Sequence, residues 1–101
     1  MGKIIAEVTV VPLGTGSPSL SKYVAEVEKV LKGFPRLKTQ LTPMSTIIEG
    51  EWDEVFAAIK AMHEKPFEMG VKRVSTRIVV DERRDKDLSM TDKIKAVEEK
   101  L

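Results

Sequence analysis

The chain has 101 residues, of which 42% are hydrophobic and 33% charged, and its formal net charge is +1. This composition is typical of one globular domain over residues 1–101 and excludes the intrinsically disordered class. With 5% aromatic residues and no basic stripe, the chain lacks the phosphate contacts and stacking platforms that nucleic-acid binding requires. The absence of cysteine excludes disulfides and thiolate metal sites and suits the cytoplasm. No apolar run is long enough to cross a membrane.

The first third of the sequence predicts a strand, a loop and a helix. Residues 3–11 are rich in β-branched side chains and alternate between a wholly apolar face and a mixed face. We expect Pro12 to stop this strand and residues 13–17 to form a glycine-rich loop. Ser17 and Pro18 are typical of an N-cap and a first helical position, and the apolar stripe that follows predicts a helix to about Lys32. Gly33 is expected to end that helix in the left-handed conformation.

The rest of the sequence predicts a hairpin, a helix, another strand and a terminal helix. The hairpin joins strands at 37–42 and 46–51 through a turn at 43–45. The helix covers about 53–63, before Pro66 ends or kinks it. A strand at 72–81 and a solvated charge run at 81–87 follow. Ser89 and Asp92 resemble the two ends of a capping box, which opens a helix to Leu101.

This β-α-β-β-α-β-α order predicts an α+β protein with the ferredoxin-like split βαβ sandwich. We expect a four-stranded antiparallel sheet with two helices on one face, plus an appended C-terminal helix. The other sheet face mixes apolar with polar side chains, whereas a face exposed to water would be more polar, so a partner subunit is its simplest cover. The side chains on that face include Ile5, Glu7, Thr9, Val11, Arg77 and Val79.

The hairpin and the helix start after it, residues 41–55, form the most unusual segment of the chain. A turn of Pro43, Met44 and Ser45 has no need of a thioether and flanking hydroxyls to reverse the chain. Hydroxyls, a carboxylate and a flexible thioether suit a small, polar, aromatic ligand. The alternative is a hairpin whose hydroxyls satisfy local backbone groups. Trp52, at the helix start, is expected to pack in the core or at an interface.

Two further sets of residues are candidates for binding. The loop at 14–17 could bind an anion at a helix N-terminus, although it lacks the lysine of a P-loop, and a capped connection is the alternative. Glu7 or Glu49 could receive an amine or a cation, or could form an ion pair with Arg77 across the sheet. His63 has no second residue that would make it catalytic. Since no nucleophile–base pair, metal cluster or acid–base dyad is evident, we do not expect an enzyme.

Six motifs follow one another along the chain: PLGTG (12–16), YVA (23–25), LTPMST with IEGEWDEV (41–55), IK with HE (59–64), RV with T (73–76) and DERRDK (81–86). In this order they closely resemble the thiamine-binding, YkoF-like family of small ferredoxin-like proteins. The resemblance implies tetramers built from dimers by sheet-to-sheet packing, with thiamine or its hydroxymethylpyrimidine moiety as ligand. Ser45 stands where glycine is common in that family, and it adds a hydroxyl to the turn.

We therefore predict a non-enzymatic small-molecule binding protein that acts as a homo-oligomer, from dimer to tetramer, with no metal and no cofactor besides this ligand. The alternative is a structural or regulatory oligomer that works through protein contacts without a thiamine-type ligand. The ligand's ring, its amine or cation and its tail or phosphate are expected to be bound by Glu7, Thr9, Thr15, Gly16, Thr42, Met44, Ser45, Thr46, Glu49 and Arg77.

Overall fold

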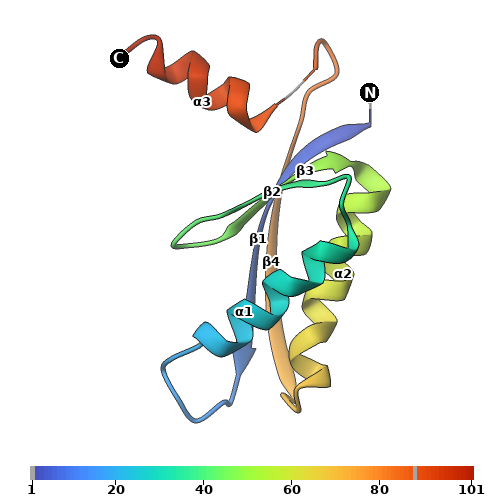
Figure 1. The fold of residues 1–101 in the computed structure, drawn as a ribbon, viewed down its shortest axis with the longest axis vertical. Coiled ribbons are helices and arrows are strands. Elements are labelled where there is room, and N and C mark those ends of the chain that lie inside the picture. Colours follow the sequence, from blue (N-terminus) through green and yellow to red (C-terminus); the bar gives the residue numbers. More distant parts are fainter. Residues whose placement is uncertain (1, 88) are drawn as a thin grey trace.

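The computed structural model describes residues 2–87 and 89–101. In chain order its elements are β1 (Lys3–Leu13), α1 (Ser21–Val30), the short 3-10 helix η1 (Leu31–Gly33), β2 (Lys38–Leu41), β3 (Thr46–Glu51), α2 (Trp52–Glu68), β4 (Arg73–Glu82) and α3 (Met90–Glu98) (Figure 1). The strands form one sheet in the order β2-β3-β1-β4, and every neighbouring pair is antiparallel. This is the strand order of the split βαβ sandwich, so the predicted fold class is confirmed.

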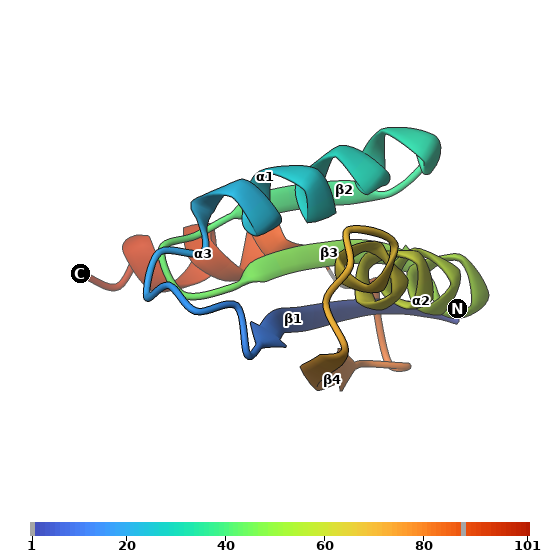
Figure 2. The same ribbon diagram turned by 90° about the horizontal axis from the view of Figure 1, so that it is seen from below.

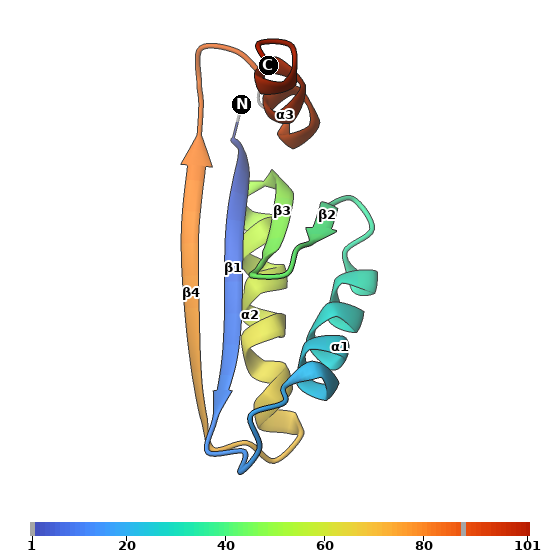
Figure 3. The same ribbon diagram turned by 90° about the vertical axis from the view of Figure 1, so that its left-hand side faces the viewer.

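The core lies between one face of the sheet and the two helices α1 and α2 (Figure 3). Alternate residues of β1 point into it, as the period of two predicts, and Ile4, Ala6 and Val8 are at most 1% exposed. Full burial of one aliphatic side chain of this size stabilises the fold by about 1.5–3 kcal/mol. The other members of the core are Val27, Leu31, Leu37, Ile48, Val55, Ala58, Ile59 and Met62.

The third helix, α3, lies apart from this core. Figure 2 shows α2 and α3 on opposite sides of β3, and α3 contains no buried residue. The Ser89 hydroxyl accepts a hydrogen bond from the Asp92 N–H at 3.4 Å, as the predicted cap requires. The helix therefore begins where the sequence indicates, although it ends at Glu98 rather than Leu101.

The ends of β1 and α1 differ from the sequence-based predictions. The strand β1 continues through Pro12, which pairs with Val74 of β4, to Leu13. The strand β3 pairs with β1 only as far as Val8, so at Pro12 one edge of β1 has no neighbouring strand among the described residues. Proline, which has no backbone N–H to donate, is tolerated at such an edge. The helix α1 begins three residues later than predicted, with Leu20 rather than Ser17 in the N-cap position.

The predicted caps of α1 are also wrong. The Ser17 hydroxyl accepts from the Ser19 N–H at 3.2 Å, so it closes a local turn two residues on instead of capping a helix. Gly33 does not have a positive φ. The helix instead tightens into the 3-10 turn η1, in which the last turn satisfies its own backbone groups without a left-handed residue.

The second helix continues past Pro66, so the prediction that this proline ends it, after about residue 63, is wrong. The helix α2 runs to Glu68 with Pro66 inside its last turns and fully buried. The free energy gained by burying the ring offsets the loss of the backbone hydrogen bond that proline cannot donate.

The remaining boundaries of the predicted strands agree with the structure to within one residue, and β3 has the predicted bounds. Asp81 lies in β4, as the predicted strand requires, and Glu82, which was predicted to lie in the charged loop, also belongs to β4. In that loop, hydrogen bonding to Arg83 lowers the pKa of Asp85 to about 2.

Candidate functional site

The turn between β2 and β3 is closed by one hydroxyl. Thr42 Oγ1 donates to the Ser45 carbonyl at 2.8 Å and accepts from the backbone N–H groups of Ser45 at 3.0 Å and Met44 at 3.3 Å. The Thr42 N–H donates to the same Ser45 carbonyl. These bonds hold the turn in one conformation, so the Thr42 side chain serves the local backbone, as the structural alternative for this segment anticipated.

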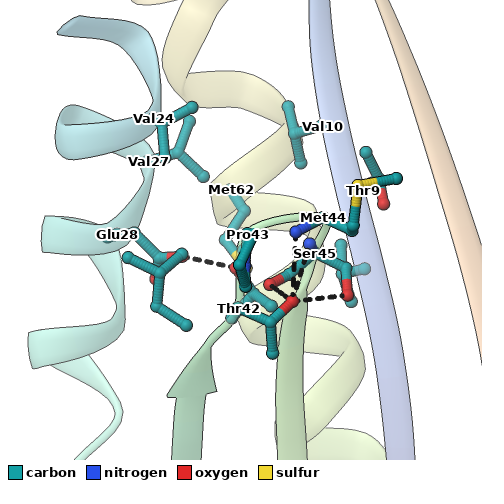
Figure 4. A pocket seen from close by; sticks show the side chains of 13 residues that line it. Thr9, Val10, Val24, Val27, Glu28, Thr42, Pro43, Met44, Ser45 and Met62 are labelled. Carbon is teal, nitrogen blue, oxygen red and sulfur yellow. Dashed lines mark hydrogen bonds between the residues drawn. The ribbon is translucent and has the colours of Figure 1, made fainter. Parts of the chain in front are cut away.

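A cavity of about 130 Å³ lies on the helix side of this turn, between the hairpin, β1 and α1 (Figure 4). Its polar groups are few: the Thr46 hydroxyl, on a residue only 6% exposed, donates to the Glu28 carboxylate from α1. Figure 4 shows Glu28 and Val10 approaching the cavity from opposite sides. Apolar walls with a few placed polar groups are typical of small-molecule sites. The walls are formed by Val8, Val10, Val24, Val27, Leu41, Pro43, Met44 and Met62.

A second hollow of about 210 Å³ lies on the open face of the sheet, on the other side of the same turn. There the Ser45 hydroxyl donates to Glu7 Oε2 at 2.9 Å. Thr9 pairs in register with Arg77, which brings one cation to the edge of this hollow. Since Thr9, Met44 and Ser45 line both hollows, the turn forms the wall between them. Met44, at the tip, is 83% exposed and free to change its conformation.

The structure brings most of the predicted site residues together around the turn. Those that line one or both hollows are Glu7, Thr9, Thr42, Met44, Ser45, Thr46 and Arg77. Thr15, with Gly16 beside it in the chain, belongs to a different region at the far end of β1, where Thr15 lines a separate basin. Because α1 begins only at Ser21, this loop does not lead directly into a helix N-terminus as the sequence suggested.

Glu49 also lies outside the two hollows. Its side chain is 2% exposed, and Oε1 accepts from the Met90 N–H, the first of α3, at 2.6 Å. The ammonium groups of Lys3 and Lys38 approach Oε2 to 3.6 and 3.8 Å. A buried carboxylate must be paired and hydrogen-bonded, and here protein groups meet that need. Glu49 therefore joins α3 to the sheet.

Glu28 is the residue of this region that the sequence did not indicate. It follows Val27 on α1, at the border of the apolar stripe that includes Val24. The sequence offered one signal for Glu28, which is a carboxylate at the border of a buried apolar stripe. However, Thr46, which donates a hydrogen bond to Glu28, is 18 residues away in sequence and on a different element. Only the packing of α1 against the hairpin brings the two side chains together.

Two ring side chains of α2, those of Trp52 and His63, contact other residues of the protein. Trp52 is 45% exposed and packs against Phe56 with 5.0 Å between ring centroids. His63 Nδ1 lies 2.6 Å from Thr76 Oγ1 and so joins α2 to β4, while its ring meets Phe67 edge-on. Within residues 2–87 and 89–101, no cluster of three His, Cys, Asp or Glu side chains is placed to hold a metal ion. Across the same residues, no helix has the length and apolarity needed to span a membrane.

The sequence matches the family described as Thiamine-binding protein over residues 6–98. It is 50% identical over 100 residues to UPF0045 protein YqgV of Bacillus subtilis, an alignment that covers 96% of each chain. The fold matches the crystal structure of MJ1052 from Methanocaldococcus jannaschii with a TM-score of 0.89, at 39% identity over 98% of this chain and 99% of that one. A Thermotoga maritima protein with a proposed role in thiamine biosynthesis or salvage shares the fold at a TM-score of 0.76 and 19% identity, over 94% and 98% of the two chains. The chain belongs to the thiamine-binding protein family, whose members include these UPF0045 proteins.

Proposed function

We propose that this protein is a cytoplasmic, non-enzymatic binding protein for thiamine or its hydroxymethylpyrimidine moiety. The observation that supports this most directly is the cavity beneath the hairpin turn, which combines apolar walls with the Glu28 carboxylate and the Thr46 hydroxyl. Membership in the thiamine-binding family supports the choice of ligand.

The size of the cavity favours one aromatic ring. Sites for drug-sized ligands start at about 300 Å³, whereas this cavity measures about 130 Å³. An aminopyrimidine is a single flat ring that carries an amine, and the Glu28 carboxylate is a suitable acceptor for that amine. The Thr46 hydroxyl can rotate toward a ring nitrogen when the ligand arrives. We therefore assign the pyrimidine to the helix side of the turn.

The rest of thiamine would extend past Met44 to the open face. The hollow there offers the Glu7 carboxylate to the cationic thiazolium, with Thr9 and Ser45 as hydrogen-bonding groups. Arg77, on the same hollow, suits a phosphate on the hydroxyethyl tail. In this proposal Glu49 has no contact with the ligand, because its carboxylate is occupied by Met90 and two lysines.

We further propose that the protein works as a homo-oligomer, a tetramer built from dimers, in which the open sheet face packs against another subunit. Val79, on that face, is 50% exposed, which is unfavourable for a lone subunit. Glu7 and Arg77 lie on neighbouring strands, so a two-fold axis would let Glu7 of one subunit pair with Arg77 of the partner subunit. The open-face hollow would then lie at the subunit interface.

A regulatory oligomer without a thiamine-type ligand is the second candidate. It is favoured by the apolar side chains of α3, where Ile94 is 50% and Val97 60% exposed, and by Leu101 beyond the end of that helix, which is 98% exposed. Such exposed apolar side chains are suited to contact another protein. This candidate predicts that thiamine and hydroxymethylpyrimidine leave the melting temperature unchanged.

Calorimetric titration with thiamine, its phosphates and hydroxymethylpyrimidine tests the proposal. We expect hydroxymethylpyrimidine and thiamine to bind, and Glu28→Gln to weaken both about tenfold or more, since it replaces a charged acceptor of the amine. Glu26→Gln is the matched control, because Glu26 lies on the same helix and pairs with Lys29 at the surface. If neither compound binds the wild-type protein at millimolar concentration, the ligand assignment is wrong and the regulatory oligomer becomes the better account.

A further inference from the structure

A basin at the far end of the sheet is distinct from both hollows at the hairpin. It has a volume of about 680 Å³ and shares no lining residue with them. Figure 3 shows the end of β1 and the start of β4 side by side there, with the loop to α1 and the loop from α2 beside them. The pairing of Leu13 with Arg73 fixes this arrangement. The volume lies within the range of about 300–1,000 Å³ that is usual for small-molecule sites.

The charged side chains that line this basin are both cations. Lys72 and Arg73 line it, and neither forms an ion pair with any residue that the structure describes. A third cation is close, because the Lys22 ammonium lies 5.3 Å from the centre of the Tyr23 ring, which also lines the basin. Among the lining residues there is no aspartate or glutamate. The three positive charges therefore have no counter-charge in the wall.

The backbone around the basin adds further donors and a capped helix end. Gly14 has a φ of +75°, and in the described part of the chain the N–H groups of Gly14 and Thr15 donate to no protein acceptor. In the loop from α2 to β4, Gly70 with a φ of +96° follows the end of α2, and the Val71 N–H donates to the Pro66 carbonyl at 3.0 Å. This left-handed glycine cap fixes the segment that carries Lys72 and Arg73.

We infer that this basin is a second ligand site, which binds a small phosphorylated molecule with an aromatic or apolar body. Arginine, lysine and free backbone N–H groups are the donors that bind phosphate in proteins. The body of the ligand would lie against the apolar part of the wall, formed by Leu13, Tyr23, Met69 and Val71. The inference does not depend on the identity of the ligand at the hairpin, because the two regions have no residue in common.

Titration followed by amide NMR shifts tests this site with three probes: phenyl phosphate, inorganic phosphate and phenol. We expect phenyl phosphate to shift the amides of residues 13–15 and 70–73 and to bind about tenfold more tightly than either inorganic phosphate or phenol, since only it engages both parts of the wall. The double variant Lys72→Gln/Arg73→Gln should lose about tenfold in affinity for phenyl phosphate. All four of the residues changed in this variant and its control are exposed, so the fold should persist, which an unchanged melting temperature verifies.

The control is Lys60→Gln/Lys86→Gln, which removes the same charge from exposed positions outside the basin. We expect it to change the affinity less than about twofold, as for screened surface charges. Equal losses in the two double variants would overturn the proposal, because they would show attraction to net charge alone. Shifts confined to the hairpin residues, or phenol that binds as tightly as phenyl phosphate to the wild-type chain, would also overturn it.

Discussion

Replacement of Glu49 by glutamine is the substitution whose outcome the structure determines most closely. The carboxylate is 2% exposed, and it accepts from the first N–H of α3 and faces two lysine ammonium groups. Glutamine has nearly the same shape, but it loses the negative charge at the helix start and turns an amide N–H₂ toward the lysines. Both changes act on the attachment of α3 rather than on the hairpin.

The size of the effect can be worked out from these contacts. A hydrogen bond to a charged group contributes about 1.5–3 kcal/mol and a neutral one about 0.5–1.5 kcal/mol. The difference is therefore about 1–1.5 kcal/mol, and a negative charge at a helix N-terminus adds about 0.3–1 kcal/mol. The two lysines are 34% and 68% exposed, so each ion pair adds less than about 1 kcal/mol. We expect the free energy of unfolding to fall by about 2 kcal/mol.

Differential scanning calorimetry at fixed protein concentration measures this loss. For a domain of this length, about 2 kcal/mol corresponds to a decrease in melting temperature of about 10 °C. Relative to the wild type, hydrogen exchange in the variant should become faster in α3 and change less in the core strands. Hydroxymethylpyrimidine should bind as it does to the wild type. Glu64→Gln is the control, because Glu64 is exposed on α2. A melting temperature within about 2 °C of the wild type, with α3 equally protected, would refute the assignment of Glu49 as the residue that attaches this helix.

Two other substitutions test the turn and the open face. Thr42→Val keeps the shape of the side chain but removes its bonds to Ser45 and Met44, and urea unfolding should show a loss of about 1–2 kcal/mol. Thr39→Val, on β2 just before the turn, should cost less. If the two threonine variants are equally stable, the Thr42 hydroxyl does not hold the turn. Val79→Glu places a charge on the open sheet face, and light scattering should show a fall in mass toward the monomer value of 11.3 kDa, whereas Lys60→Glu should leave the assembly intact. A wild-type chain that already scatters as a monomer would contradict the oligomer proposal.

The type and order of the elements could be predicted from the sequence because the signals for them are local. Alternation in β1 and helical spacing in α2 depend only on which side chains face the core, and the bounds of β3 followed from the turn before it and the helix after it. The predictions that were wrong concern residues whose local preference is overridden by a distant contact. Pro66 remains inside α2 because its ring is buried in the core, and Pro12 remains in β1 because β3 does not extend far enough to need its N–H.

For the candidate site, the sequence by itself determined which segment to consider and which kinds of side chain it offers. The hairpin turn and its hydroxyls were recognisable without coordinates, since they are contiguous in the chain. Only the tertiary structure decided how the carboxylates are distributed. In the folded chain Glu49 bonds to α3, Glu28 lines the cavity and Glu7 lies on the open face of the sheet. Each of these carboxylates bonds to a residue between 18 and 41 positions away in sequence. No local pattern encodes such a contact, because it exists only once the helices and strands have packed.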